Sequence, residues 1–273
     1  MPDLSGLPYD EIAFDRTATL VDPGQVDATA AALASAAGHS ADLVVLSHGW
    51  NDTADEARAL YAAFGANFAV ALAANGVLPA RRVQVLGILW PSKRFADARL
   101  TPAEPAHALI TTQLTRVESL AGADLSDARA QVPRLTRSVA AQRTFIDHVL
   151  ATLPPTATQE EAQPAHLVQM AGDPHFLDRL GSPVLGSASP GGTPLTAHAL
   201  QAEALRMPAV ATGIGDWFSA IDAGALNLLN YATYYLMKDR AGHIGRNGLA
   251  PVLARLRAAA PNTRVHLVGH SFG

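Results

Sequence analysis

The chain has 273 residues, a net charge of −4 and an apolar fraction of 49%, which suits one large α/β domain or a domain with a lid. Its two lysines are Lys93 and Lys238, and its arginines are scattered. Nucleic-acid binding needs a concentrated basic face, so we expect no nucleic-acid partner. The absence of cysteine excludes disulfides, zinc–thiolate sites and a cysteine nucleophile.

The sequence starting at Met1 lacks the basic and apolar regions of a signal peptide. Residues 59–80 carry no charge and are long enough to span a bilayer. Their alanine content, together with Gly65 and Gly76, fits a helix packed on a sheet better. We therefore expect a cytoplasmic protein without an integral membrane segment.

Two continuous apolar runs, 42–47 and 83–90, are typical of strands buried on both faces of a parallel sheet. Between them, Asp52 or Thr53 can cap a helix that ends near residues 75–76.

Ahead of these runs, residues 11–14 form a short strand candidate, and 27–37 an alanine-rich helix closed by Gly38. The first third thus alternates strands and helices, with right-handed crossovers expected.

The middle of the chain, 92–240, differs because it offers one weak strand candidate, 166–170. Its other predicted segments are a helical stretch at 126–153 interrupted near Pro133, loops at 153–164 and 181–196, and an apolar, aromatic stretch at 217–237. The aromatic stretch either packs an inserted helix on the core or lines a pocket for an acyl or alkyl chain.

The end of the chain returns to regular structure. Residues 244–259 predict an amphipathic helix whose regular part begins around Pro251. Residues 264–268 predict another buried strand, which runs directly into Gly269.

That strand leads into Gly269-His270-Ser271-Phe272-Gly273, a Gly-x-Ser-x-Gly motif. Such a serine sits on a sharp turn after a strand, where its hydroxyl projects from the sheet and the flanking glycines allow close backbone approach. We interpret Ser271 as the nucleophile of a serine hydrolase.

A second motif, His48-Gly49-Trp50, follows the strand at 42–47. Acyl transfer needs preorganised amides that stabilise an oxyanion. We predict that the amide of Phe272 is one donor and that of Trp50 the other, with Asn51 as the alternative to Trp50. A simple strand-ending turn around a tryptophan is the competing interpretation.

Together, the His48-Gly49-Trp50 motif, the strand ending at Trp90 and the motif around Ser271 resemble the serine α/β-hydrolase superfamily, and in particular bacterial esterase- and lipase-like members. The resemblance covers roughly residues 10–91 and 241–273. It implies a mostly parallel α/β sheet in which the strand leading to Ser271 lies beside the strand leading to His48. The resulting domain assignment is a hydrolase core at 1–91 and 241–273, with a mainly helical cap or lid inserted at 92–240.

The family's triad runs serine, acid, histidine, which places the acid and histidine after Ser271, beyond Gly273. We therefore expect this chain to be an incomplete piece and inactive alone. Earlier histidines are poor substitutes because none has an aspartate partner at a readable spacing. The histidines considered are His48, His107, His148, His166, His175, His198, His243 and His266.

The same resemblance leaves the strand at 264–268 as an unpaired apolar edge, which favours self-association. For the full-length protein it implies a serine-dependent ester or acyl hydrolase acting on a small-molecule or lipid ester, without a metal or organic cofactor. Lipid, short-chain ester, thioester and peptide substrates all stay open. The alternative is a non-catalytic module that binds a ligand or a protein on a hydrolase scaffold.

Overall fold

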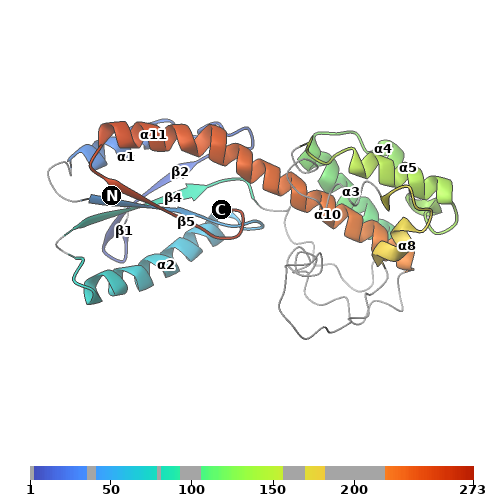
Figure 1. Cartoon of the computed structure of the whole chain (residues 1–273), viewed down its shortest axis with the longest axis horizontal. Coiled ribbons are helices and arrows are strands. Elements are labelled where there is room, and N and C mark those ends of the chain that lie inside the picture. Colours follow the sequence, from blue (N-terminus) through green and yellow to red (C-terminus); the bar gives the residue numbers. More distant parts are fainter. Residues whose placement is uncertain (1–2, 36–40, 79–80, 93–105, 156–169, 182–218) are drawn as a thin grey trace. The chain divides into compact units, whose positions relative to one another are not determined.

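The structure is a computed structural model. It describes residues 3–35, 41–78, 81–92, 106–155, 170–181 and 219–273. The chain divides into two compact units, one formed by residues 1–96 and 240–273 and the other by residues 97–239 (Figure 1).

The first unit is built on a five-stranded sheet in the order β1-β2-β4-β3-β5. Its strands are β1 (Asp3–Leu4), β2 (Leu7–Ala13), β3 (Ala41–Ser47), β4 (Arg82–Leu89) and β5 (Arg264–Gly269). The pairs β2–β4, β4–β3 and β3–β5 are parallel and β1–β2 is antiparallel. The prediction of an α/β fold with a mostly parallel sheet is confirmed.

The start of the sheet differs from the sequence-based prediction. Strand β2 begins at Leu7 rather than at residue 11, and β1 was not expected. The two form a hairpin whose turn residues Ser5 and Gly6 have φ of 54° and 85°. Two left-handed residues in succession make the tight turn that matches the twist of paired strands.

Strand β5 lies directly beside β3, in a register that pairs Asp42 with Arg264 and Ser47 with Gly269. The two strands therefore end together, and the residues that follow them meet at one edge of the sheet. This is the neighbour relationship expected for the strands that lead to His48 and Ser271.

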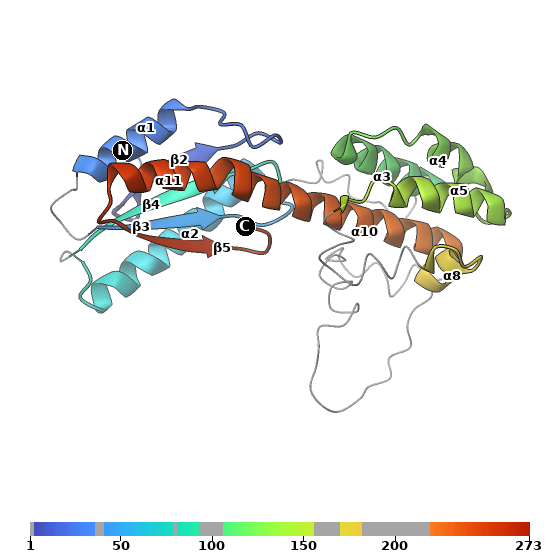
Figure 2. The same cartoon turned by 45° about the horizontal axis from the view of Figure 1, so that its top comes forward.

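Helices cover both faces of this sheet (Figure 2). Helices α1 (Gly24–Ser35) and α11 (Ala250–Ala259) pack against each other on one face. Helix α2 (Ala54–Ala74) covers the other, where it buries Ala57 and Tyr61 against strand residues. A sheet covered on both sides explains why the β3 and β4 sequences are apolar without alternation.

Helix α2 begins at a capping box, in which the Thr53 hydroxyl accepts from the Glu56 amide at 3.1 Å and the Glu56 carboxylate accepts from the Thr53 amide at 2.7 Å. It ends at Asn75, as predicted. By length and composition alone, helix α2 could cross a membrane. In its most apolar stretch of 18 residues, 17% is buried in the structure. The remaining face is exposed, with Val70 at 70%.

The helical segment before β5 is irregular. Residues Ile244–Leu249 form a π-helical turn (η3) that follows α10 (Ala220–His243), and the regular helix α11 begins at Ala250 with Pro251 in its first turn. The predicted start of the regular helix around Pro251 is confirmed. Pro251 follows directly on the π-helical turn, so its missing N–H falls where the helical hydrogen-bond pattern already changes.

In the part that the structure describes, the second unit is helical. Its elements are α3 (Ala106–Ala121), α4 (Ser126–Gln131), the 3₁₀ turn η1 (Val132–Arg134), α5 (Val139–Leu150), α8 (Phe176–Gly181) and α10 up to residue 239. Helices α3, α5, α8 and α10 share one apolar core that includes Leu114, Phe145, Phe176 and Leu228. The predicted helical interruption near Pro133 is confirmed by η1.

Several predictions for the middle of the chain fall on residues that the structure does not describe. Most of the strand candidate 166–170 and most of the two predicted loops lie outside the described residues.

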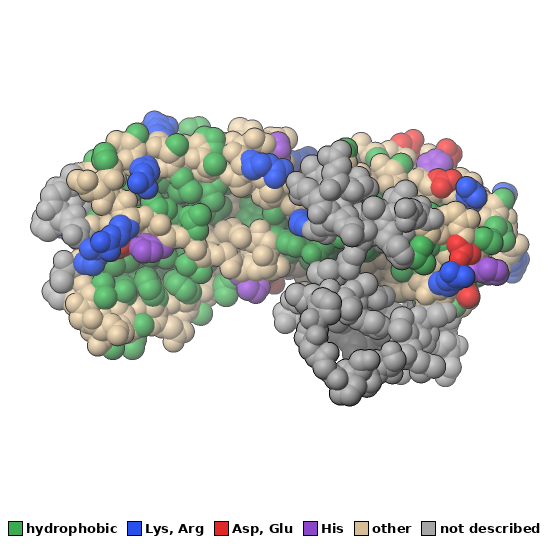
Figure 3. Space-filling view, viewed as in Figure 1, with side chains coloured by type: hydrophobic (Ala, Val, Ile, Leu, Met, Phe, Trp, Pro, Cys, Tyr) green, Lys and Arg blue, Asp and Glu red, His purple; other side chains and the backbone are tan. Residues whose placement is uncertain are grey.

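Strand β5 is the last in the sheet order, with β3 as its partner. Leu267 is 66% exposed and Val268 39% exposed. Hydrophobic side chains appear at the surface between α11, β5 and α2 in Figure 3. The predicted apolar edge is therefore present among the described residues. The prediction that this strand is buried is wrong, because β5 is an edge strand and most of its residues are exposed.

Candidate functional site

Ser271 lies in a sharp turn immediately after β5, and its φ is 58°. The turn is held by two backbone bonds, from the His270 amide to the Ser47 carbonyl at 3.0 Å and from the Gly273 amide to the His270 carbonyl at 2.9 Å. A serine in the left-handed region is sterically unfavourable, and such strain clusters at functional sites. This is the backbone geometry that the Gly-x-Ser-x-Gly motif predicts.

The glycines of both motifs are required by close backbone approach. A Cβ atom on Gly269 would collide with the Gly273 carbonyl, and one on Gly273 would collide with the carbonyls of Ser47 and His48. A Cβ on Gly49 would lie 3.0 Å from the His270 carbonyl oxygen. The three glycines therefore allow the loop after β3 and the turn after β5 to touch.

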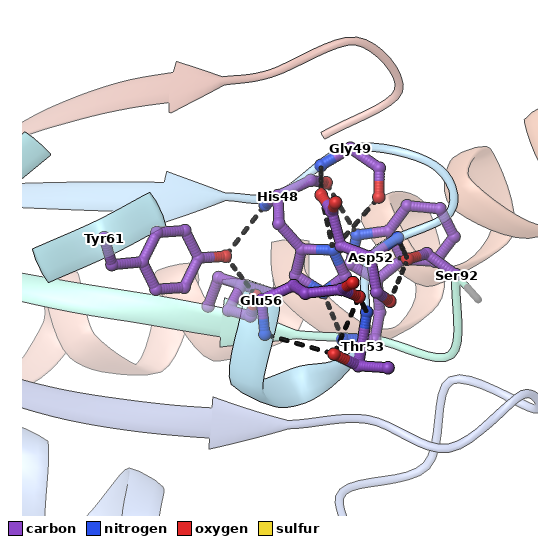
Figure 4. Close-up of polar contacts among 9 residues, drawn as sticks. His48, Gly49, Asp52, Thr53, Glu56, Tyr61 and Ser92 are labelled. Atoms are coloured by element: carbon purple, nitrogen blue, oxygen red, sulfur yellow. Dashed lines mark hydrogen bonds and ion pairs between the residues drawn. The ribbon is translucent and has the colours of Figure 1, made fainter. Parts of the chain in front are cut away.

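Hydrogen bonds to the end of β4 fix the loop after β3 (Figure 4). The Asn51 amide donates to the Ser92 carbonyl at 3.0 Å, and the Asp52 amide donates to the Ser92 hydroxyl at 3.2 Å. The Gly49 amide donates to the Asp52 carboxylate at 3.2 Å. The Asn51 amide, the alternative oxyanion donor, therefore already has a carbonyl acceptor.

The two predicted oxyanion residues come together across the β3–β5 pair. The rings of Trp50 and Phe272 stack with centroids 6.0 Å apart and planes 27° apart. Sequence reasoning proposed the two amides, but it did not anticipate the contact between the rings. Offset aromatic stacking adds to the contacts that hold the two loops in one arrangement.

His48 supports the loop structurally. It is 1% exposed, its Nε2 accepts from the Trp90 amide at 3.2 Å, and its Nδ1 lies 3.0 Å from the Gly49 carbonyl. Because an amide can only donate, Nε2 is unprotonated and Nδ1 carries the hydrogen. Burial lowers the pKa of His48, so the ring is neutral and both nitrogens are occupied.

Trp90 and Tyr61 complete the support of His48, and Figure 4 shows the hydroxyl of Tyr61 pointing toward His48. The Trp90 ring stacks on the His48 ring at 5.4 Å, and its Nε1 donates to the His48 carbonyl at 3.0 Å. The Tyr61 hydroxyl accepts from the His48 amide at 2.8 Å and donates to the Ile88 carbonyl at 2.6 Å. Helix α2 is thereby tied to the carboxyl ends of both β3 and β4.

Among the described histidines considered above, four have a carboxylate within 4.0 Å, although their sequence spacing did not reveal it. The pairs are His48–Asp52 at 3.8 Å, His107–Asp222 at 3.9 Å, His148–Asp127 at 3.5 Å and His266–Asp42 at 2.9 Å. In the described part of the chain, no histidine hydrogen-bonds the Ser271 hydroxyl. The structure therefore brings the candidate nucleophile and the candidate oxyanion residues together, and no described histidine completes a triad with them.

The closest pair, His266–Asp42, lies toward the other end of the sheet, roughly 15 Å along the strands from Ser271. Asp42 also accepts from the Arg81 guanidinium at 2.5 Å. Burial of Asp42 opposes its ionisation, but the bonds from Arg81 and His266 outweigh burial and keep the pKa of the carboxyl below its ordinary value. This cluster joins β3 to β5 and to the segment before β4.

Among the residues that the structure describes, no group of three histidine, cysteine, aspartate or glutamate side chains could hold a metal ion. Searches for similar proteins found no matching family model, no matching curated protein and no matching solved structure.

Proposed function

We propose that this protein is a serine-dependent acyl hydrolase of the α/β-hydrolase type that acts on ester bonds, with Ser271 as its nucleophile. The observation that carries the proposal is the left-handed conformation of Ser271 directly after a parallel strand. The left-handed conformation costs a serine conformational free energy, whereas for a nucleophile it exposes the hydroxyl at the sheet edge.

In the proposed reaction, the Ser271 hydroxyl oxygen attacks the ester carbonyl carbon while a general base takes its proton. The amides of Trp50 and Phe272 stabilise the negative charge on the carbonyl oxygen. Collapse of this intermediate expels the alcohol and leaves an acyl group on Ser271, which water then removes. We assign no residue to the general base or to the acid that orients it.

Two features of the fold support this assignment. The strand leading to Ser271 pairs with the strand leading to His48, as the resemblance implies. The helical unit, residues 97–239, lies in the sequence between β4 and β5, the position at which the resemblance implies an inserted cap. Covalent catalysis by serine requires no metal or organic cofactor.

A second candidate function is a ligand- or protein-binding module that uses the same scaffold without turnover. It is favoured by one observation, namely that no described histidine hydrogen-bonds Ser271. The two functions make opposite predictions for the reactivity of Ser271.

The deciding experiment treats the protein, at the length its gene encodes, with a fluorophosphonate probe and maps the labelled peptide. The hydrolase proposal expects labelling at Ser271, loss of labelling in Ser271→Ala, and no change in Ser35→Ala, which alters an exposed serine on α1. A folded protein that stays unlabelled would support the binding module and refute the hydrolase.

A further inference from the structure

The loop that follows β2 lies at the same edge of the sheet as Ser271. Strands β2, β4, β3 and β5 are parallel, so their carboxyl ends share one edge, where ligands bind in open α/β sheets. The loop after β2 contains Arg16, which is exposed. This edge therefore carries a cationic side chain in addition to the candidate catalytic residues.

A second guanidinium, that of Arg240, reaches the same edge from the end of α10. Its Nη1 donates to the Pro91 carbonyl at 3.4 Å. Pro91 stands between Trp90, which bonds His48, and Ser92, which bonds the loop after β3. The Arg240 side chain thus lies beside the backbone that supports the candidate oxyanion loop.

The segments that carry Arg16 and Arg240 touch each other within the first unit. His243 Nε2 lies 3.4 Å from the Thr17 carbonyl oxygen, and a Cβ on Gly248 would lie 3.1 Å from the Ala18 carbonyl oxygen. His243 follows Arg240 by three positions, so both side chains are on one face of the helix. The loop with Arg16 therefore lies against the helix face that carries Arg240.

The local charges favour an anion between these side chains. Burial, and then the neighbouring Arg16, lower the pKa of Arg240, and a bound anion would offset both effects. In the loop itself, Asp15 uses its Oδ1 as acceptor for the Thr17 amide, the Thr17 hydroxyl and the Thr19 amide.

We propose that Arg16 and Arg240 bind an anionic group, a carboxylate or a phosphate, on the substrate whose carbonyl Ser271 attacks. The assignment of this anion to a substrate rests on the proposed hydrolase function. Guanidinium groups suit the role because their planar donors match carboxylate and phosphate oxygens.

The sheet order sets the length of such a substrate. Strand β4, whose end lies next to Pro91, is separated from β5 by β3 alone. Two strand spacings are about 10 Å. Arg16 follows β2, which is three spacings from β5. The substrate class is therefore an ester whose anionic group lies roughly 10–15 Å from the scissile carbonyl.

The first test measures binding by the 273-residue chain, with no need for catalysis. Octyl phosphate and octanoate are titrated against the chain by calorimetry, with octanol as the neutral control. We expect binding of at least one anion and none of octanol, and the preferred anion identifies the head group. Loss of one guanidinium contact should weaken binding roughly tenfold or more in Arg16→Gln and in Arg240→Gln.

Three further variants separate the possible outcomes. Arg257→Gln removes an exposed arginine elsewhere in the first unit and should leave binding unchanged. Arg240→Lys keeps the positive charge and can be tested if Arg240→Gln does not fold. It should bind the anion more weakly than the wild type, because lysine lacks the planar donors of a guanidinium. Binding of neither anion, or equal binding by the Arg16 and Arg257 variants, would overturn the anion site.

Ser271→Ala distinguishes failure of the site from failure of the hydrolase. Its anion binding should equal that of the wild type. If anions bind through Arg16 and Arg240 while the fluorophosphonate never labels Ser271, the hydrolase function fails and the anion site stands. If Ser271 is labelled and the anions do not bind, the hydrolase stands and the anionic substrate class is refuted.

Discussion

Gly49 lies so close to the turn around Ser271 that a Cβ atom at position 49 would stand 3.1 Å from the Ser271 Cβ and 2.6 Å from the His270 Nδ1. The side chain of any other residue must push the two loops apart. The contact therefore couples the candidate oxyanion loop to the candidate nucleophile.

Gly49→Ala is expected to destabilise the protein by about 1–3 kcal/mol, the usual cost of overpacking, and to reduce labelling of Ser271 by a fluorophosphonate. Chemical denaturation and probe labelling measure the two effects. Gly245→Ala is the matched control, because a Cβ there meets nothing within 4 Å. Equal behaviour of the two variants would contradict the coupling.

Ser271 itself stores strain, since φ at this position is 58°. A left-handed conformation costs a residue with a Cβ about 1–2 kcal/mol, and glycine avoids this cost. We expect Ser271→Gly to be about 1 kcal/mol more stable than Ser271→Ala, as measured by urea denaturation of both. Identical midpoints and slopes would show that the turn carries no such strain.

The buried His48 ring predicts a pH dependence of stability. Its pKa is lowered by burial in the folded state, so the unfolded chain binds a proton more readily. The stability linked to the neutral ring is therefore fully present above the unfolded pKa, about 6.5, and is lost as pH falls through the lower, folded pKa.

In His48→Phe the Trp90 amide loses its acceptor, which should cost about 1–3 kcal/mol at neutral pH. The free energies of unfolding of wild type and variant should converge as the pH falls below about 6.5. Urea denaturation at a series of pH values tests this, and parallel curves would argue against a neutral, buried His48.

The exposed edge of β5 predicts self-association through Leu267, which is 66% exposed. Leu267→Lys should lower the apparent mass in light scattering, because a charged side chain disfavours pairing of strand edges. Val70→Lys is the control, since Val70 is also an apolar residue and is exposed to a similar degree, 70%, on helix α2. If both variants, or neither, reduce association, the edge of β5 is not the contact.

The 273-residue chain should hydrolyse p-nitrophenyl acetate no faster than its Ser271→Ala variant. The reason is that no histidine in the described residues hydrogen-bonds the Ser271 hydroxyl, and serine is a weak nucleophile without an adjacent base. Hydrolysis that depends on Ser271 would show that this chain supplies its own base.

The sequence alone determined those helices, strands and turns that depend on residues close together in the chain. Runs of apolar residues predicted β3 and β4, because strands covered on both faces need no polar side. The run at 264–268 predicted the strand β5 correctly, but its predicted burial is wrong, since β5 is exposed at the edge of the sheet. The pair Asp52 and Thr53 marked where helix α2 begins, because capping acts within one helical turn, and the structure shows that Thr53 is the cap. Pro251 marked the start of the regular helix α11. The motif around Ser271 likewise predicted a sharp turn after a strand.

Tertiary structure decided the contacts between residues far apart in the chain. His48 accepts from Trp90, which lies 42 positions away, and His266 bonds Asp42 across 224 positions. No sequence period links such residues, so their partners depend on which strands become neighbours. The partner of the Asn51 amide was decided the same way, since its bond to the Ser92 carbonyl forms when the ends of β3 and β4 meet.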